Sequence, residues 1–243
     1  MAHPSQDRTG QRRPALTIAG PADFAAAFAV SRETITRLES YAALLQQWQK
    51  AVNLVAASTL DTVWQRHFAD SAQLVSLAPE ARRWVDLGSG AGFPGLVIAI
   101  VLADAAHAEN PAPAAEPGAR ITLIESDHRK GAFLRAVARQ LGVTVDILST
   151  RIESDATQSR VAAPDVVTAR ALAPLDKLLS LAAPLWSPRT IGLFLKGREA
   201  ANEVETALKV WTFQHELIPS STEAEAHIVR VSTLEPNRKE PRS

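Results

Sequence analysis

Hydrophobic residues recur at helical spacing in the first third of the chain. Between residues 32 and 52 the apolar positions lie three or four apart, and Ser31 precedes them in the position of a helix N-cap. A second helical segment is expected at residues 58–77, where Trp64 and Phe68 continue a similar spacing. We therefore predict that this part of the chain is helical and that each helix buries one face.

After residue 83 the pattern changes to short apolar runs that alternate with helical segments. Strands are predicted at residues 84–87, 121–124, 143–148, 165–168, 191–195, 211–217 and 226–231, and helices at 94–102, 129–141, 175–185 and 199–210. Nearly continuous apolar strands that alternate with helices are typical of a parallel sheet covered on both faces. The last two strands have no helix between them, which favours antiparallel pairing. The sequence predicts a Rossmann-like α/β fold with about seven strands and a terminal antiparallel hairpin.

The element pattern also divides the chain. Residues 1–20 and 236–243 are expected to be terminal tails, the first of them disordered. Residues 21–82 form a predicted helical extension, and residues 83–235 form the predicted sheet domain. Within that domain, residues 103–119 lengthen a connection that usually takes about 2–6 residues, and their Ala, Pro and Glu content gives little to bury. We predict a disordered surface insertion there.

Composition narrows the possible functions. Hydrophobic residues make up 46% of the 243, enough for a core, while 26 basic and 26 acidic residues leave no net charge. An RNA partner would therefore have to be bound by a local site, because the strongly basic balance of many nucleic-acid-binding domains is absent. Cysteine is absent too, which excludes disulfides, thiolate metal ligands and a cysteine nucleophile. We find no secretory signal and no run of about 18 apolar residues, and expect a soluble, cytoplasmic protein without a metal or a membrane partner.

A glycine-rich turn at residues 86–95 carries the strongest chemical signal. It follows a predicted strand and opens a helix, where backbone N–H groups can approach a ligand closely. Its second half fits the G-x-G-x-x-G pattern of dinucleotide-binding folds, whereas the stretch from Asp86 fits the acidic-x-G-x-G-x-G pattern of S-adenosylmethionine (SAM) methyltransferases. Asp86 favours SAM, because a carboxylate beside the turn would attract a sulfonium and repel a pyrophosphate. The alternative is a turn that only packs the helix on the strand.

Glu125 is the candidate ligand for the ribose of that cofactor. It ends the second predicted strand. Once residues 103–119 are set aside, it follows the turn by roughly 20 residues, the spacing of ribose-binding acids. A solvated glutamate at a strand end is the structural alternative.

The residues that the chain lacks limit the methyl acceptor. Methylation at C5 of a pyrimidine needs a cysteine thiolate, and there is none. The Asn/Asp-Pro-Pro-aromatic turn of exocyclic amine methyltransferases is not found after the fourth strand, where Ala169 is followed by Arg170. Guanine N7 remains as an acceptor with an exposed lone pair and no proton to remove. Its methylation needs positioning and electrostatics rather than a general base.

Short motifs in order along the chain, from about residue 44 to residue 197, carry a family resemblance. They are Asn53-Leu54, Arg66-His67-x-x-Asp70-Ser71, Val85-Asp86-Leu87-Gly88-Ser89-Gly90-Ala91-Gly92-Phe93-Pro94-Gly95, Arg129-Lys130, Phe133-Leu134, Arg151-x-Glu153, Arg170-Ala171 and Leu195-Lys196-Gly197. Together they resemble the glucose-inhibited division protein B family, the bacterial small-subunit ribosomal RNA guanine-N7 methyltransferases. The chain departs from that family in its longer insertion and in Glu125, where an aspartate is common.

The resemblance implies a class I SAM-dependent methyltransferase that acts, as a monomer, on 16S ribosomal RNA or on the small ribosomal subunit. It implies that Gly88 and Phe93 contact SAM, and that Ile152 and Glu153 flank the adenine. It also implies that Arg170 lies in the cofactor site. The predicted cofactor-binding residues are these five together with Asp86, Gly90 and Glu125.

Two basic residues at strand ends are the predicted catalytic residues. Arg170 and Lys196 follow neighbouring strands on the ligand side of the sheet, where each could hold an RNA phosphate or guanine O6. Arg66 and His67 join Lys196 as predicted substrate-binding residues. The structural alternatives are an ion pair of Arg170 with Glu153 or Asp165, surface charge for Arg66, and a packed side chain for His67.

Two other functions remain open from the sequence. One is a methyltransferase of the same fold that acts on a small molecule or on a protein. The other is a non-enzymatic module that binds a nicotinamide dinucleotide through the same glycine-rich turn.

Overall fold

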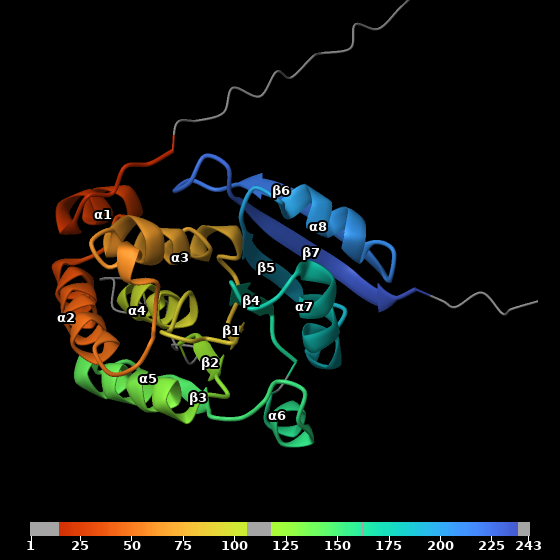
Figure 1. Ribbon diagram of the computed structural model, residues 1–243, viewed down its shortest axis with the longest axis horizontal. Coiled ribbons are helices and arrows are strands. Elements are labelled where there is room, and N and C mark those ends of the chain that lie inside the picture. Colours follow the sequence, from red (N-terminus) through yellow and green to blue (C-terminus); the bar gives the residue numbers. More distant parts are fainter. Residues whose placement is uncertain (1–14, 106–117, 162, 238–243) are drawn as a thin grey trace, which may run out of the picture.

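The computed structural model describes residues 15–105, 118–161 and 163–237, and a seven-stranded sheet lies at its centre (Figure 1). The strands are β1 (Arg83–Leu87), β2 (Arg120–Ile124), β3 (Asp146–Leu148), β4 (Val166–Arg170), β5 (Ile191–Lys196), β6 (Trp211–Pro219) and β7 (His227–Pro236). Their order is β3-β2-β1-β4-β5-β7-β6; β1 to β5 are parallel, and β7 is antiparallel to both β5 and β6. The predicted α/β fold and its terminal antiparallel hairpin are confirmed.

Alternation along β1 divides the interior into two cores. Val85 and Leu87 belong to one buried cluster and Trp84 to the other, as expected when successive side chains point to opposite faces. By the same alternation Asp86 points to the face of Trp84. Only 1% of its surface is exposed.

Helices cover both faces of the sheet (Figure 1). On the Trp84 face lie α4 (Gly95–Ala105) and α5 (His128–Leu141), and the predicted end of α5 is confirmed by Gly142, which has a left-handed backbone. On the other face lie α7 (Leu175–Ala182) and α8 (Ala200–Ala207). A short helix that the sequence did not predict, α6 (Asp155–Arg160), follows β3.

The N-terminal helices pack outside α4 and α5. The first, α1 (Pro21–Phe28), was not predicted; α2 (Arg32–Gln49) was, and the Ser31 hydroxyl accepts a hydrogen bond from Thr34 N as an N-cap. Phe24, Leu38 and Tyr41 are fully buried in the same cluster as α4 and α5. The helical extension and this face of the sheet therefore share one core.

The helical segment expected at residues 58–77 is confirmed only in part, because its turns do not form one continuous helix. The chain instead forms a 3-10 turn (Ala57–Thr59), a π-helical turn (Trp64–Ala69), α3 (Asp70–Ala72) and a second 3-10 turn (Val75–Leu77). Polar side chains of this segment hydrogen-bond to distant loops: the Gln65 amide group donates to Leu16 O and Thr222 O. A π-helical turn is a common feature of functional sites, because it re-aims side chains within a helix.

The predicted boundaries at the termini need one correction. The prediction that residues 1–20 are disordered is wrong for residues 15–20, because Ile18 is buried and Leu16 N donates to Ser221 O. Residues 1–14, most of the predicted insertion (106–117) and residues 238–243 lie outside the described residues. Ala103 belongs to α4 rather than to the insertion. Among the described residues, no helix is long and apolar enough to cross a membrane.

Candidate functional site

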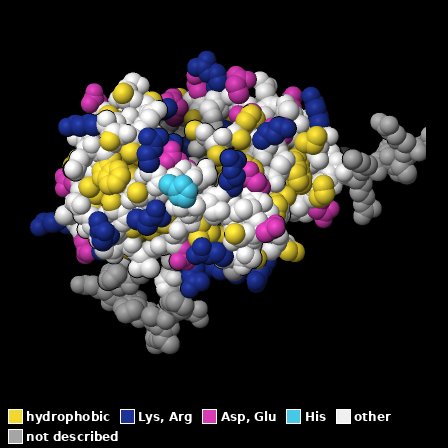
Figure 2. All heavy atoms as spheres, turned by 60° about the horizontal axis from the view of Figure 1, so that its bottom comes forward, with side chains coloured by type: hydrophobic (Ala, Val, Ile, Leu, Met, Phe, Trp, Pro, Cys, Tyr) yellow, Lys and Arg dark blue, Asp and Glu magenta, His cyan; other side chains and the backbone are white. Residues whose placement is uncertain are grey.

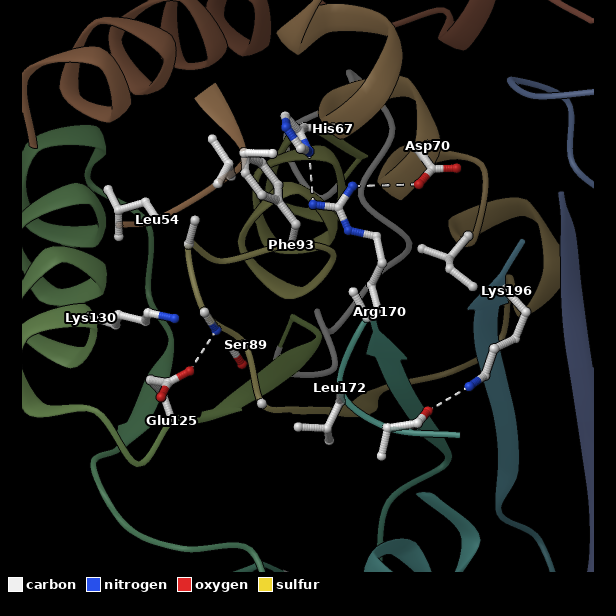
Figure 3. Close-up of a pocket in the computed structure, with 18 of the residues that line it drawn as sticks. Leu54, His67, Asp70, Ser89, Phe93, Glu125, Lys130, Arg170, Leu172 and Lys196 are labelled. Atoms are coloured by element: carbon white, nitrogen blue, oxygen red, sulfur yellow. Dashed lines mark hydrogen bonds and ion pairs between the residues drawn. The ribbon is translucent and has the colours of Figure 1, made fainter. Parts of the chain in front are cut away.

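An open cavity of about 1370 Å³ lies at the carboxyl ends of β1, β2, β4 and β5 (Figure 3). The glycine-rich turn, the irregular segment after α2 and the β6–β7 loop form its walls. Ten of the predicted site residues line it: Arg66, His67, Gly88, Gly90, Phe93, Glu125, Ile152, Glu153, Arg170 and Lys196. Asp86 does not line this cavity. The carboxyl end of a parallel sheet is where open α/β folds bind ligands.

The glycine-rich turn brings its backbone to the cavity. Gly88 has φ +64°, and a Cβ built there would lie 2.5 Å from Leu172 Cδ1 across the cavity wall. A larger residue would therefore be strained in its backbone and would displace Leu172. Gly95 allows the start of α4 to approach β1 and β2 closely, since a Cβ at this position would lie less than 3 Å from Asp86 and Leu123. Helix α4 thus begins directly against β1 and β2.

Asp86 supports the turn from behind. Its Oδ2 accepts a hydrogen bond from Gly95 N at 3.2 Å, near the positive N-terminal end of α4, and its Oδ1 accepts one from Thr168 Oγ1 at 2.9 Å. Burial raises the pKa of this carboxyl to about 6, although these hydrogen bonds lower it. The expectation that Asp86 faces a ligand does not match this geometry: its carboxylate fixes the start of α4.

Glu125 closes the turn from the side of β2. It is 7% exposed, so the alternative of a solvated strand-end glutamate is wrong. Its Oε2 accepts a hydrogen bond from Gly90 N at 2.8 Å, and its Oε1 accepts one from Asp127 N at 2.7 Å. A buried carboxylate held at the rim of a glycine-rich turn can accept hydrogen bonds from vicinal hydroxyl groups. Lys130 lines the cavity on the same side (Figure 3).

The loop after β3 completes this side of the cavity. Ile152 is 8% exposed and Glu153 lies beside it, with its carboxylate 4.0 Å from the Arg151 guanidinium. An apolar side chain next to an acceptor suits the face and the edge of a purine ring.

Phe93 lies at the junction of the glycine-rich turn and the N-terminal segment. Its ring stacks on Tyr41, with centroids 5.3 Å apart, and on His67, with centroids 4.7 Å apart. The Tyr41 hydroxyl donates a hydrogen bond to Ala91 O in the same turn. The turn is thereby fixed against α2, which the sequence did not place near it.

Arg170 is the last residue of β4, and its guanidinium is held on several sides (Figure 3). Nη1 donates to Arg66 O at 2.7 Å and lies 3.5 Å from Asp70 Oδ2. Nη2 donates to His67 Nδ1 at 2.8 Å, and Cζ lies 4.9 Å from the centroid of the Phe93 ring. The structural alternative, an ion pair of Arg170 with Glu153 or Asp165, is wrong, because the carboxylate that pairs with Arg170 belongs to Asp70.

His67 is a packed residue that orients Arg170. Because a guanidinium only donates, Nδ1 must accept, so Nε2 carries the proton and donates to Thr59 Oγ1 at 2.8 Å. The Thr59 hydroxyl in turn donates to Ala56 O. Burial and the neighbouring arginines lower the pKa of His67 to about 3. The imidazole is therefore neutral at physiological pH and is part of a directed chain of hydrogen bonds that fixes Arg170.

Lys196 ends β5 on the opposite wall. Its Nζ lies 2.7 Å from Glu203 Oε2 and donates to Ala173 O at 2.6 Å, and only 9% of the side chain is exposed. Arg66, in contrast, is half exposed and pairs with Glu223 at 2.8 Å. The sequence therefore identified three of the basic residues that line the cavity, Arg66, Arg170 and Lys196, but not their partners.

The sequence analysis did not give Tyr41, Thr59 or Glu203 a role, although the first two fix Phe93 and His67 and the third holds Lys196. Tyr41 is far from Phe93 in the chain, and Thr59 and Glu203 lie eight and seven positions from His67 and Lys196, spacings that no local pattern marks. Asp70 was quoted only as part of a motif. Burial raises its pKa, and Arg170 and Thr222 lower it.

Positive and negative side chains are mixed on the one face of the molecule that Figure 2 shows. Neither kind forms a continuous field on that face. Within residues 15–105, 118–161 and 163–237 there is no group of three or more His, Asp or Glu residues arranged to hold a metal ion.

Comparison with solved structures supports the fold. An O-methyltransferase of Streptomyces achromogenes, TomG, in complex with SAM gives a TM-score of 0.54 at 13% identity, and covers 88% of this chain and 95% of TomG. An O-methyltransferase of Bacillus cereus in complex with SAH gives 0.53 at 13% identity, and covers 80% of this chain and 91% of the other. At this identity the similarity shows the class I methyltransferase fold alone.

Sequence relatives are much closer. Proteins named ribosomal RNA small subunit methyltransferase G from Parvibaculum lavamentivorans and Rhodospirillum centenum are each 50% identical to this chain, over 212 and 215 residues. The alignments cover 87% and 88% of this chain, and 88% and 91% of those proteins. A family model described as GidB, rRNA small subunit methyltransferase G, matches residues 34–229. The chain therefore belongs to the GidB family, the one that its motifs resemble.

Proposed function

We propose that the cavity at the carboxyl ends of β1, β2, β4 and β5 is where this chain transfers a methyl group to N7 of a guanine in 16S ribosomal RNA. As a GidB family member, the chain is a SAM-dependent methyltransferase of small-subunit ribosomal RNA. One observation carries the placement: the glycine-rich turn, Glu125 and Arg170 are far apart in the sequence and yet line a single cavity.

One part of the cavity fits SAM, and we call it the cofactor half: Gly88, Gly90, Phe93, Glu125, Ile152 and Glu153. Gly88 keeps the backbone of the turn bare at the cavity wall, where a side chain would collide with Leu172, and Glu125 offers a buried carboxylate for ribose hydroxyls. Ile152 and Glu153 suit an adenine. When bound, SAM supplies an electrophilic methyl group. We assign Asp86 a positioning role, because it holds the start of α4 behind the turn.

The other part of the cavity we call the acceptor half: Arg66, His67, Arg170 and Lys196. Arg170 and Lys196 can each donate a hydrogen bond to guanine O6 or to a phosphate, and each is held in place, Arg170 by the buried His67 and Lys196 by Glu203. His67 orients Arg170 rather than contacting RNA, because both of its ring nitrogens are already hydrogen-bonded. The proposed role of this half is to hold the guanine so that N7 faces the methyl group.

Positioning is enough for this reaction. Guanine N7 has a lone pair and carries no proton, so no base has to remove one. Holding the two reactants at the right distance can account for a large part of the rate enhancement. The chain has no cysteine for a covalent route to a pyrimidine carbon.

We further propose that the chain acts as a monomer in the cytoplasm. We also propose that the chain is organised as a helical extension (21–82) followed by a methyltransferase domain (83–235). Size-exclusion chromatography with light scattering measures the molar mass in solution: a monomer should give 26.1 kDa, and a dimer would give twice that mass.

The test of function is methyl transfer from tritiated SAM to isolated small ribosomal subunits, to naked 16S ribosomal RNA and to protein. We expect counts in RNA, and mass spectrometry should locate them on N7 of a guanine. Lys196→Met should lower the rate by roughly 100-fold while SAM binding persists, because a buried charged donor is lost. Lys209→Met, an exposed lysine outside the cavity, is the matched control. Counts in protein alone, or on another base, would contradict the proposal.

A further inference from the structure

The charges around the cavity cancel one another. Six basic and six acidic side chains line it: Arg66, Lys130, Arg151, Arg170, Lys196, Arg198, Asp70, Glu125, Glu153, Glu203, Glu223 and Glu225. Most of the basic side chains have a carboxylate within 4.0 Å. In an RNA-binding cavity with no excess of positive charge, contacts with phosphates alone contribute little binding free energy.

Two of these ion pairs stand out because they are shorter than 3 Å although both partners are exposed; the exposed pair of Arg151 and Glu153 is longer, at 4.0 Å. Arg66 lies 2.8 Å from Glu223, with side chains 50% and 46% exposed, and Arg198 lies 2.9 Å from Glu225, with side chains 72% and 65% exposed. The pairs of Arg170 and Lys196 are mostly buried. Exposed pairs are weak and exchange readily with other anions.

Both exposed carboxylates belong to one loop, which connects β6 to β7 and is firmly fixed. Thr222 donates to Asp70 Oδ1 at 3.0 Å, and Ser221 N donates to Gln73 Oε1 at 2.9 Å. Gln73 and Thr222 are each 7% exposed. The loop is therefore held in place and presents its two carboxylates to two separate arginines, Arg66 from the π-helical turn and Arg198 from the segment that follows β5.

We propose that Glu223 and Glu225 are specificity determinants, which compete with RNA phosphates for Arg66 and Arg198. The inference rests on the proposed function, since it takes RNA as the substrate. A phosphodiester and a carboxylate each carry one negative charge, so exchanging one for the other yields little net free energy. Tight binding then requires an RNA that also inserts a base into the cavity. An RNA that does not insert a base into the cavity can only exchange its phosphates for these carboxylates, and it therefore binds weakly.

The test uses the full chain with two probes, poly(U) and isolated small ribosomal subunits, at low and high salt. The double variant Glu223→Gln/Glu225→Gln should bind poly(U) about tenfold more tightly than the wild type at low salt, because two competing carboxylates are removed. The gain should shrink at high salt. Affinity for small subunits should rise less, so discrimination between the two probes falls. SAM affinity should stay at the wild-type value.

The matched control is Glu205→Gln/Glu216→Gln, which removes the same charge from exposed positions on α8 and β6, outside the cavity. An equal gain in poly(U) affinity in this control would overturn the inference, because net charge alone would explain the effect. Adding Arg66→Gln and Arg198→Gln to the test variant should abolish the gain, since the carboxylates act through these arginines.

The two proposals fail in different ways. A wild-type chain that transfers no methyl group to small-subunit RNA would contradict the proposed function. A wild-type chain that does so, beside a Glu223→Gln/Glu225→Gln variant with unchanged poly(U) affinity, would contradict only the role of these carboxylates.

Discussion

The two halves of the cavity are built in different ways. The cofactor half consists of short stretches that follow β1, β2 and β3, and much of it is backbone: Gly90 N bonds to Glu125, and the missing side chain of Gly88 lets Leu172 pack closely against the turn. The acceptor half collects Arg170, His67 and Lys196 from separate segments and fixes them through side-chain hydrogen bonds. A parallel sheet brings strand ends together by its topology, whereas the acceptor half depends on the N-terminal helices being docked.

The largest expected effect tests whether the acceptor half can exist without those helices. Residues 83–235 alone should not fold, because Leu96 and Phe133 would lose the buried partners Phe24 and Tyr41 and expose a large apolar face. Urea unfolding followed by circular dichroism should show no cooperative transition. The control is a chain of residues 15–237, which keeps the whole cluster and should unfold cooperatively. A cooperative transition in residues 83–235 would mean that the helical extension is an independent layer.

The second effect concerns the cofactor half alone. Gly88→Val should lower SAM affinity by more than about 100-fold, because its Cβ meets Leu172 at the cavity wall and the β-branched residue disfavours φ +64°. Calorimetric titration with SAM measures this. Gly142→Val is the matched control, since Gly142 has φ +62° with no atom within 4 Å of a built Cβ. It should lose similar stability and keep SAM binding; if it also loses SAM binding, backbone strain alone explains the effect.

The same contrast explains what the sequence could predict. The strands after residue 83 and the antiparallel hairpin follow from hydrophobic periodicity, and Glu125 follows from its spacing after the turn, whereas Gly88 and Phe93 were assigned to the site by the family resemblance. Asp86 was identified by the turn motif, and alternation along β1 points its carboxylate to the start of α4; its predicted role as a cofactor ligand stays a prediction.

The acceptor half was predicted only in part. Arg170 and Lys196 were found because each ends a strand, but Asp70 and Glu203, which hold them, lie 100 and 7 positions away with no common pattern. The helix predicted at residues 58–77 is interrupted because Gln65 and Gln73 bond to the β6–β7 loop, which no local propensity encodes. Tertiary hydrogen bonds, rather than local helix propensity, determine the backbone conformation of residues 58–77.

The third effect tests the rigidity of the acceptor half. Arg170→Lys keeps the positive charge but cannot reach Arg66 O, Asp70 and His67 together, because an ammonium lacks the planar fork of donors. Methyl transfer to small subunits should fall by roughly 100-fold in kcat while SAM affinity changes little. Arg66→Lys, at an exposed pair, is the control and should change kcat by less than about threefold. Equal losses in both variants would show that the buried hydrogen bonds do not matter.

The smallest effect isolates the neutral imidazole that orients Arg170. The pKa of His67 is about 3 in the folded chain and about 6.5 in the unfolded chain, so between these values the unfolded chain binds a proton that the folded chain does not. Its contribution to stability is therefore complete above pH 6.5 and is lost as the pH falls towards 3, with a slope of up to about 1.4 kcal/mol per pH unit. His67→Gln keeps an acceptor for Arg170 and a donor for Thr59 but does not titrate.

The free energy of unfolding of His67→Gln should consequently depend less on pH between 4 and 6 than that of the wild type, as measured by urea denaturation at each pH. Substituting an exposed histidine, His128→Gln, should leave the wild-type slope intact, because that imidazole is in water in both states. If the slopes of the wild type and His67→Gln coincide, the imidazole is not held neutral. The hydrogen bonds from Arg170 to His67 and from His67 to Thr59 would then not fix the acceptor half as inferred, whereas the cofactor half would be unaffected.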